Sequence, residues 1–179
     1  IMRKKAFGYD KMVGERAIPG LYDVDMLGYN YRMNELEAAL GIVQLSRIDK
    51  FLEKRQQNSF ELRKALQDIS EIRLLSEGSE DFDHSNYCVV AILQDKLAVK
   101  RYEIINQLRE EGVGVSIYYP GPVPHLSYYK QKYGLGDVNY PNASKISNNS
   151  LALSVGPHLD VDDMVYMAQK LKTIIHGVK

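Results

Sequence analysis

The chain has 179 residues, which suits one domain of average size, and its 23 basic and 23 acidic residues cancel, so no positive field points to nucleic acid. No apolar run approaches the ~20 residues that a membrane-spanning helix needs, and the first residues show no apolar signal core. A single cysteine excludes an internal disulfide and a cysteine-based zinc site, so we expect a cytoplasmic protein without a metal centre.

The first third of the chain predicts a loop followed by helices. Residues 8–29 contain several glycines and a proline and show little apolar periodicity, which is typical of a loop. Asn34, with Glu37 three residues later, matches a capping box and predicts a helix start. Apolar residues continue at helical spacing as far as Ile69. The pattern fits either one long bent helix or two helices that meet near Ser46.

The remaining two thirds alternate strands and helices. We expect short strands at 72–75, 86–93, 113–119 and 151–155, and helices at 99–112, 126–134 and 159–175, with a further helix leading into the fourth strand. The apolar run at 86–93 predicts that Cys88 is a core thiol, and side-chain alternation predicts that Tyr118 and Tyr119 lie on opposite faces. The order predicts an α+β fold, a small and mostly antiparallel sheet with helices on one face.

Two groups of residues are candidates for a binding site. Tyr29, Asn30, Tyr31 and Arg32 stand just before the predicted helix at Asn34. Free backbone N–H groups at a helix start favour an anion, and amide and guanidinium groups add donors that suit phosphate or carboxylate. A turn with a surface arginine explains this pattern equally well.

The second candidate group surrounds a proline-rich loop. Tyr118, Tyr119 and His125 lie at or after the end of the strand predicted at 113–119, and strand ends often carry binding groups. We expect the side chains of Tyr118 and His125 to line one cleft. No glycine-rich phosphate loop and no Ser/His/Asp grouping stands out elsewhere in the sequence.

Three stretches carry a resemblance that covers nearly the whole chain in order. They are "GYNYRMNELEAALGIVQLSRIDKFLEKRQ", "GVGVSIYYPGPVPHLSYYKQKYG" and "YPNASKISNNSLALSVGPHLDVDDMVYMAQKL". Together they resemble the C-terminal part of the DegT/DnrJ/EryC1/StrS family, pyridoxal-phosphate (PLP) dependent aminotransferases of fold type I. The resemblance implies a homodimer with shared active sites that acts on nucleotide-linked keto sugars.

The resemblance also implies roles for the candidate residues. Asn30 matches an asparagine that reaches the PLP phosphate of the partner subunit, and Arg32 matches an arginine at the same shared site. Tyr29, Tyr31, Tyr118 and His125 are assigned to the substrate side. The Schiff-base lysine of the family precedes the matched segment, so we expect no catalytic residue in this chain and infer a fragment that is inactive alone.

The implied domain organisation has three parts: residues 1–33 as the end of a large-domain helix with an interface loop, 34–70 as linking helices, and 71–179 as the small C-terminal domain. Two departures from the family pattern, Ala143-Ser144 for Ala-Glu and Gly156-Pro157 for His-Pro, bear on the substrate more than on the reaction.

The reaction implied is transfer of an amino group, commonly from glutamate, to a keto sugar, within polysaccharide or cell-envelope biosynthesis. Two alternatives stay open at this point. Some relatives carry histidine in place of the lysine and dehydrate deoxysugars instead. A non-catalytic fragment or binding module would show no effect of the cofactor at all.

Overall fold

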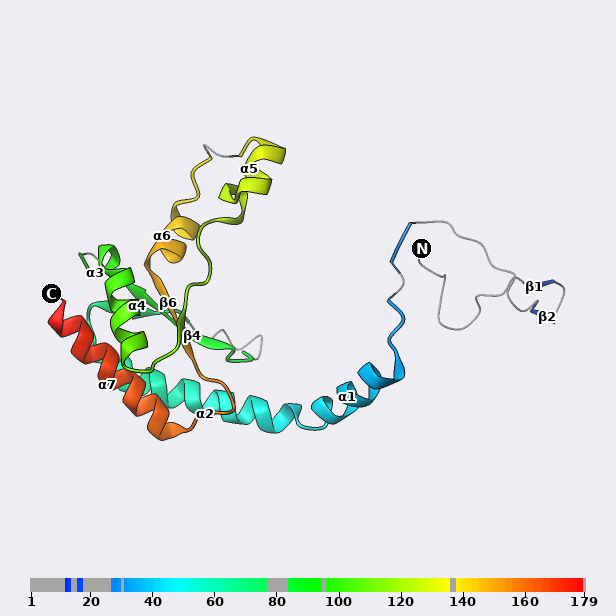
Figure 1. Cartoon of the computed structure of the whole chain (residues 1–179), viewed down its shortest axis with the longest axis horizontal. Coiled ribbons are helices and arrows are strands. Elements are labelled where there is room, and N and C mark those ends of the chain that lie inside the picture. Colours follow the sequence, from blue (N-terminus) through cyan, green and yellow to red (C-terminus); the bar gives the residue numbers. More distant parts are fainter. Residues whose placement is uncertain are drawn as a thin grey trace. The chain divides into compact units, whose positions relative to one another are not determined.

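The chain forms two compact units, Ile1–Ser46 and Arg47–Lys179. This computed structural model describes residues 12–13, 16–17, 27–29, 31–76, 84–94, 96–135 and 138–178. Figure 1 follows the chain through both units. The segment predicted as linking helices, residues 34–70, is divided between them, and its role as a linker stays a prediction. Within the described ranges no helix is long and apolar enough to cross a membrane.

The described residues of the first unit form a short hairpin and one helix. Strands β1 (Met12–Val13) and β2 (Arg16–Ala17) pair antiparallel, and helix α1 spans Glu35–Leu45. The predicted capping box is confirmed, because the Asn34 side chain accepts from the backbone N–H of Glu37 and the Glu37 carboxylate accepts from that of Asn34. None of the α1 residues is buried.

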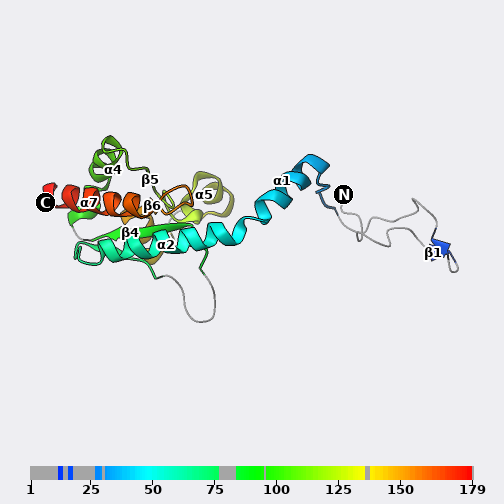
Figure 2. The same cartoon turned by 90° about the horizontal axis from the view of Figure 1, so that it is seen from below.

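Two long helices lie side by side in the second unit. Helix α2 spans Ile48–Leu66 and helix α7 spans Val161–Gly177, and the two pack against each other (Figures 1 and 2). A two-residue turn separates α1 from α2, so the sequence encodes two helices and not one bent helix. Asp160 and Asp163 form a second capping box at the start of α7.

The sheet of this unit has four strands in the order β3-β4-β6-β5, all paired antiparallel. Their bounds are β3 (Ile72–Leu74), β4 (Cys88–Leu93), β5 (Val115–Ser116) and β6 (Ser150–Ser154). The predicted α+β fold with a small antiparallel sheet is therefore confirmed. The strand expected at 113–119 is much shorter, because only Val115 and Ser116 pair with β6.

The two faces of the central strands have different surroundings. Val89, Ala91 and Leu93 alternate along β4 and are fully buried within the cluster that includes α2 and α7 residues. The other face of the same ladder carries Cys88, which pairs with Ser154. The helical core therefore covers one face, and the second face is left for shorter elements and for the pocket described below.

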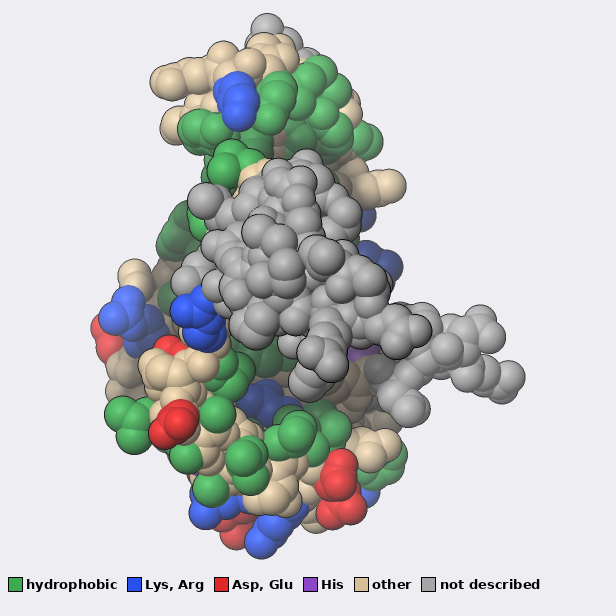
Figure 3. Space-filling model, turned by 90° about the vertical axis from the view of Figure 1, so that its right-hand side faces the viewer, with side chains coloured by type: hydrophobic (Ala, Val, Ile, Leu, Met, Phe, Trp, Pro, Cys, Tyr) green, Lys and Arg blue, Asp and Glu red, His purple; other side chains and the backbone are tan. Residues whose placement is uncertain are grey.

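The shorter elements complete the unit. They are helices α3 (Lys96–Val99), α4 (Arg101–Glu110), α5 (Ser127–Tyr133) and α6 (Pro141–Asn149), and the 3₁₀ helix η1 (Val123–His125). Gly112 and Gly134 adopt positive φ angles of 75° and 65° just after α4 and α5, as expected for glycines that end helices. Hydrophobic side chains gather around α5, at the top of Figure 3, where Tyr128 and Tyr133 are exposed.

Candidate functional site

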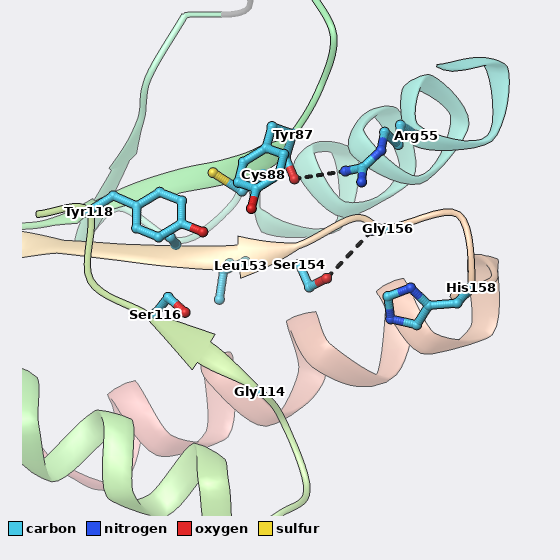
Figure 4. A pocket seen from close by; sticks show the side chains of 11 residues that line it. Arg55, Tyr87, Cys88, Gly114, Ser116, Tyr118, Leu153, Ser154, Gly156 and His158 are labelled. Carbon is cyan, nitrogen blue, oxygen red and sulfur yellow. Dashed lines mark hydrogen bonds between the residues drawn. The ribbon is translucent and has the colours of Figure 1, made fainter. Parts of the chain in front are cut away.

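A pocket of about 250 Å³ opens beside the sheet face that carries Cys88. Its lining comes from α2, from the residues around β4 and β5, and from the end of β6 with the turn that follows: Arg55, Tyr87, Cys88, Gly114, Ser116, Tyr118, Ala152, Leu153, Ser154, Gly156 and His158. Figure 4 shows these side chains converging from separate elements. The described lining contains no aspartate or glutamate, so positive and neutral polar groups set its character.

Arg55 links α2 to the entry of β4. Its Nη1 donates to the carbonyl oxygen of Tyr87 at 3.0 Å and, at 3.5 Å, to that of Asn86 (Figure 4). The guanidinium carbon also lies 5.5 Å from the centre of the Tyr87 ring, within the range of a cation–π contact. No described carboxylate forms an ion pair with Arg55, and the hydrogen-bond acceptors described for its guanidinium are neutral carbonyl oxygens.

Two tyrosines of the lining, Tyr87 and Tyr118, stack on each other, and Tyr119 continues the stack outside the described lining. The rings of Tyr87 and Tyr118 are 6.1 Å apart, and those of Tyr118 and Tyr119 are 5.1 Å apart with an angle of 15°. The prediction that Tyr118 and Tyr119 lie on opposite faces is wrong, because β5 ends at Ser116 and strand alternation no longer applies. Hydrogen bonding to Tyr87, together with desolvation, raises the pKa of Tyr118 to about 12, so this hydroxyl stays protonated.

Cys88 is half-buried and lines the pocket, so the prediction of a core thiol is wrong. The apolar run is continuous in sequence, but Cys88 lies on the face opposite to Val89 and is the first residue of β4. Burial raises the pKa of the thiol, and the charge of Arg55 partly opposes that shift.

The turn after β6 is held by a buried amide. Asn58 on α2 is fully buried, and its Nδ2 donates at 3.1 Å to the carbonyl oxygens of both Gly156 and Leu159. A Cβ at position 156 would meet Cε1 of His158 at 2.5 Å. The absence of a side chain at Gly156 therefore lets the imidazole of His158 lie against the backbone at the rim of the pocket.

His125 lies outside this lining. Its Nε2 is 2.8 Å from the carbonyl oxygen of Val138, and its ring meets that of Tyr140 edge to face. The structure thus places Tyr118 in the pocket and His125 on η1 beside the segment leading to α6, and does not bring the two together in the expected cleft. A substrate role for each stays a prediction.

The residues before α1 are described in part. Tyr29, Tyr31 and Arg32 are exposed, and the two tyrosine rings are 5.7 Å apart, while Asn30 lies outside the described residues. The helix start is less open to an anion than the sequence suggests, because Asn34 already accepts from the N–H of Glu37 and two carboxylates stand in the first turn. Any anion here depends on side-chain donors such as Arg32.

Arg55, Asn58 and His158 were not singled out by the sequence. Arg55 and Asn58 sit in a polar stretch of helix, and their partners are 31 to 101 residues away in the chain. The one usable signal was Gly156, a glycine beside a proline and a histidine, which indicates close packing in a turn.

The comparison with protein families decides the relationship. The model of the DegT/DnrJ/EryC1/StrS aminotransferase family matches residues 5–172. The chain belongs to this family. Membership agrees with the three stretches of resemblance and with the small antiparallel sheet.

Several curated proteins are similar to this chain. The spore coat polysaccharide biosynthesis protein SpsC of Bacillus subtilis is 29% identical over 158 residues, which cover 87% of this chain and 40% of that protein. The dTDP-4-amino-4,6-dideoxy-D-glucose transaminase of Shigella dysenteriae is 26% identical, covering 97% of this chain and 44% of that protein. The chain thus spans less than half the length of these relatives.

Solved structures of similar proteins support the fold. The putative sugar aminotransferase Spr1654 of Streptococcus pneumoniae, in its PLP form, matches with a TM-score of 0.78 and 26% identity over 88% of this chain and 40% of that one. The aminotransferase PseC of Helicobacter pylori has the same TM-score at 18% identity and covers 90% of this chain and 43% of that one. The described chain therefore has the fold of a portion of a fold type I aminotransferase.

Proposed function

We propose that the protein containing this chain is a PLP-dependent aminotransferase that transfers an amino group, with glutamate as the donor, to a nucleotide-linked keto sugar. The family match over residues 5–172 carries this proposal. Similarity to proteins named as nucleotide-sugar transaminases, such as those of Shigella dysenteriae and Campylobacter jejuni, supports the substrate class. The names of SpsC and of the lipopolysaccharide protein RfbH support a role in polysaccharide biosynthesis.

The residues before α1 fit the phosphate of PLP. Arg32 is exposed and forms no ion pair with a carboxylate in the described ranges, so its forked guanidinium is available to an oxyanion. With the helix start already capped, Asn30 and Arg32 are the donors we assign to the cofactor of the partner subunit. PLP, when bound, supplies the electron sink for the transfer of the amine.

Further assignments follow from the same proposal. Tyr29, Tyr31, Tyr118 and His125 are the proposed contacts on the substrate side, and residues 71–179 form the proposed small domain of a cytoplasmic homodimer. No lysine of this chain matches the family's Schiff-base lysine in its sequence context. We therefore propose that these 179 residues alone do not catalyse the reaction.

The test uses the complete polypeptide that contains this chain, purified with PLP. Supplied with glutamate and nucleotide-linked keto sugars, it should convert a sugar C=O to CH–NH₂ and release one 2-oxoglutarate for each amine formed, as measured by mass spectrometry. Loss of a sugar hydroxyl with no amine in the sugar product would instead support the dehydratase. A protein that retains no PLP and changes neither substrate would support the non-catalytic module.

A further inference from the structure

The pocket on the open sheet face combines a cation with neutral donors. Arg55 contributes a guanidinium whose Nη1 is used by two carbonyl oxygens and whose charge has no described carboxylate partner. The hydroxyls of Tyr118, Ser116 and Ser154 line the same space (Figure 4). Such hydroxyls can donate to an anion, and no acidic residue of the described lining would repel one.

The size of the pocket limits what it can hold. Its volume of about 250 Å³ lies below the ~300–1,000 Å³ that is usual for clefts enclosing drug-sized ligands. A whole nucleotide sugar is larger than this space, whereas a single carboxylate or phosphate group with its nearest atoms fits it.

Contacts within the chain itself hold the shape of the pocket, without any contribution from a ligand. Asn58 fixes the turn that carries Gly156, and Arg55 fixes the backbone at Tyr87. The stacked rings of Tyr87 and Tyr118 hold the Tyr118 hydroxyl on the side of the space next to Cys88 (Figure 4). Donors fixed in this way lose little conformational entropy when a ligand binds.

We propose that this pocket, between Arg55 and Tyr118, is a binding site for a small oxyanion, the carboxylate or phosphate group of a ligand. This proposal goes beyond the aminotransferase assignment, and its test needs neither PLP nor turnover. The oxyanion site and the aminotransferase activity can therefore be disproved independently. The cofactor phosphate is assigned instead to Asn30 and Arg32.

Cys88 provides a built-in probe, because it is the only cysteine of the chain and lines the pocket. Iodoacetate and iodoacetamide both react with the thiolate, forming an S–C bond while the C–I bond breaks and iodide leaves. Because both need the same thiolate, the ratio of their rates does not depend on the pKa of Cys88. The ratio reports only whether the surroundings attract an anionic reagent more than a neutral one.

The experiment measures this ratio in the full 179-residue chain and in 2-mercaptoethanol as a neutral free thiol. The proposal places the carboxylate of iodoacetate ~4 Å from the guanidinium of Arg55, and a unit positive charge at that distance should raise the ratio about fivefold above that of the free thiol, even at a water-like dielectric. Arg55→Gln should bring it back to the free-thiol value while keeping an N–H donor for the carbonyl of Tyr87. Arg109→Gln removes the same charge from the exposed end of α4 and should leave the ratio unchanged.

Protection experiments identify the anion. At constant ionic strength, glutarate and inorganic phosphate in separate arms should slow alkylation by iodoacetamide, and the neutral glutaramide should not. Protection by glutarate alone assigns a carboxylate site, and protection by phosphate alone assigns a phosphate site. Tyr118→Phe keeps the ring stack and removes one donor, so it should weaken protection several-fold even if Arg55→Gln does not fold. A rate ratio equal to that of 2-mercaptoethanol, or no protection by either anion, overturns the proposal.

Discussion

At the scale of single residues, Asn58 binds the turn after β6 through its side-chain amide. It is fully buried on α2, and one amide nitrogen donates to the carbonyl oxygens of Gly156 and Leu159. Its own Oδ1 has no hydrogen-bond partner among the described groups, so the side chain is held by its donors alone. Removing those donors leaves two carbonyl groups without their partner in a site from which water is largely excluded.

We therefore expect Asn58→Ala to lower the free energy of unfolding by about 1–3 kcal/mol. Asn58→Asp should lower it further at neutral pH, because it places a carboxylate against two carbonyl oxygens with no donor nearby. Urea denaturation of both variants measures the effect, with Asn106→Ala, an exposed asparagine on α4, as the matched control. An aspartate variant as stable as the parent chain would show that the amide donors do not hold the turn.

At the scale of elements, the two capping boxes offer a comparison within one chain. Asn34 with Glu37 starts α1, and Asp160 with Asp163 starts α7, with the same pair of backbone–side-chain hydrogen bonds. The helices differ in what they bury. Six residues of α7 are buried against the core, whereas α1 buries none. Fraying of α7 is therefore coupled to the core of its unit, and fraying of α1 is not.

Asp160→Ala should lower the free energy of unfolding of the Arg47–Lys179 unit by about 0.5–2 kcal/mol, the usual cost of losing an N-cap. Asn34→Ala should reduce helical content slightly and leave the unfolding midpoint of that unit within error. Both are measured by urea denaturation followed by circular dichroism. Equal shifts of the midpoint in the two variants would contradict the expectation that a cap contributes to the midpoint only where its helix buries residues.

The elements also show which features the sequence could predict. The helix starts at Asn34 and Asp160 and the helix ends at Gly112 and Gly134 were predictable, because caps act within a few residues of the chain. The strand expected at 113–119 was overextended, because its length depends on how far β6 runs beside it. The pocket was not predictable, since Asn58 and Gly156 are 98 residues apart and only the folded chain brings them together.

The family relationship could also be predicted from the sequence. Like the helix caps, the "GYNYR" stretch and the helix that follows it are contiguous in the chain. A contiguous sequence pattern does not predict which distant residues surround each side chain in the fold. Cys88 lies in an unbroken apolar run and yet faces a pocket, because a strand has two faces and the helical core covers only one of them. Arg55 was not singled out by the sequence, and in the fold it donates to the carbonyl oxygen of Tyr87 at the entry to β4.

At the scale of the whole molecule, the proposed dimer requires Asn30 and Arg32 to bind the phosphate of PLP. The capped start of α1 leaves few backbone N–H groups for an anion, so the side chains would have to supply the binding. Loss of a hydrogen bond to a charged phosphate costs roughly 1.5–3 kcal/mol, or about tenfold to a hundredfold in affinity. In the complete polypeptide, Asn30→Ala and Arg32→Ala should each weaken retention of PLP by that factor with little loss of stability.

The claim that these residues serve the partner's cofactor has a separate test in mixed dimers. One subunit carries Asn30→Ala, and the other lacks the Schiff-base lysine that the family places before the matched segment. If Asn30 acts across the interface, one site of each mixed dimer keeps both groups and the other loses both. Activity should then return on mixing, at a PLP concentration that saturates the parent protein but not the Asn30→Ala homodimer. If both variants pair normally with the parent subunit and the mixed dimers remain as poorly saturated as the Asn30→Ala homodimer, Asn30 acts within its own subunit.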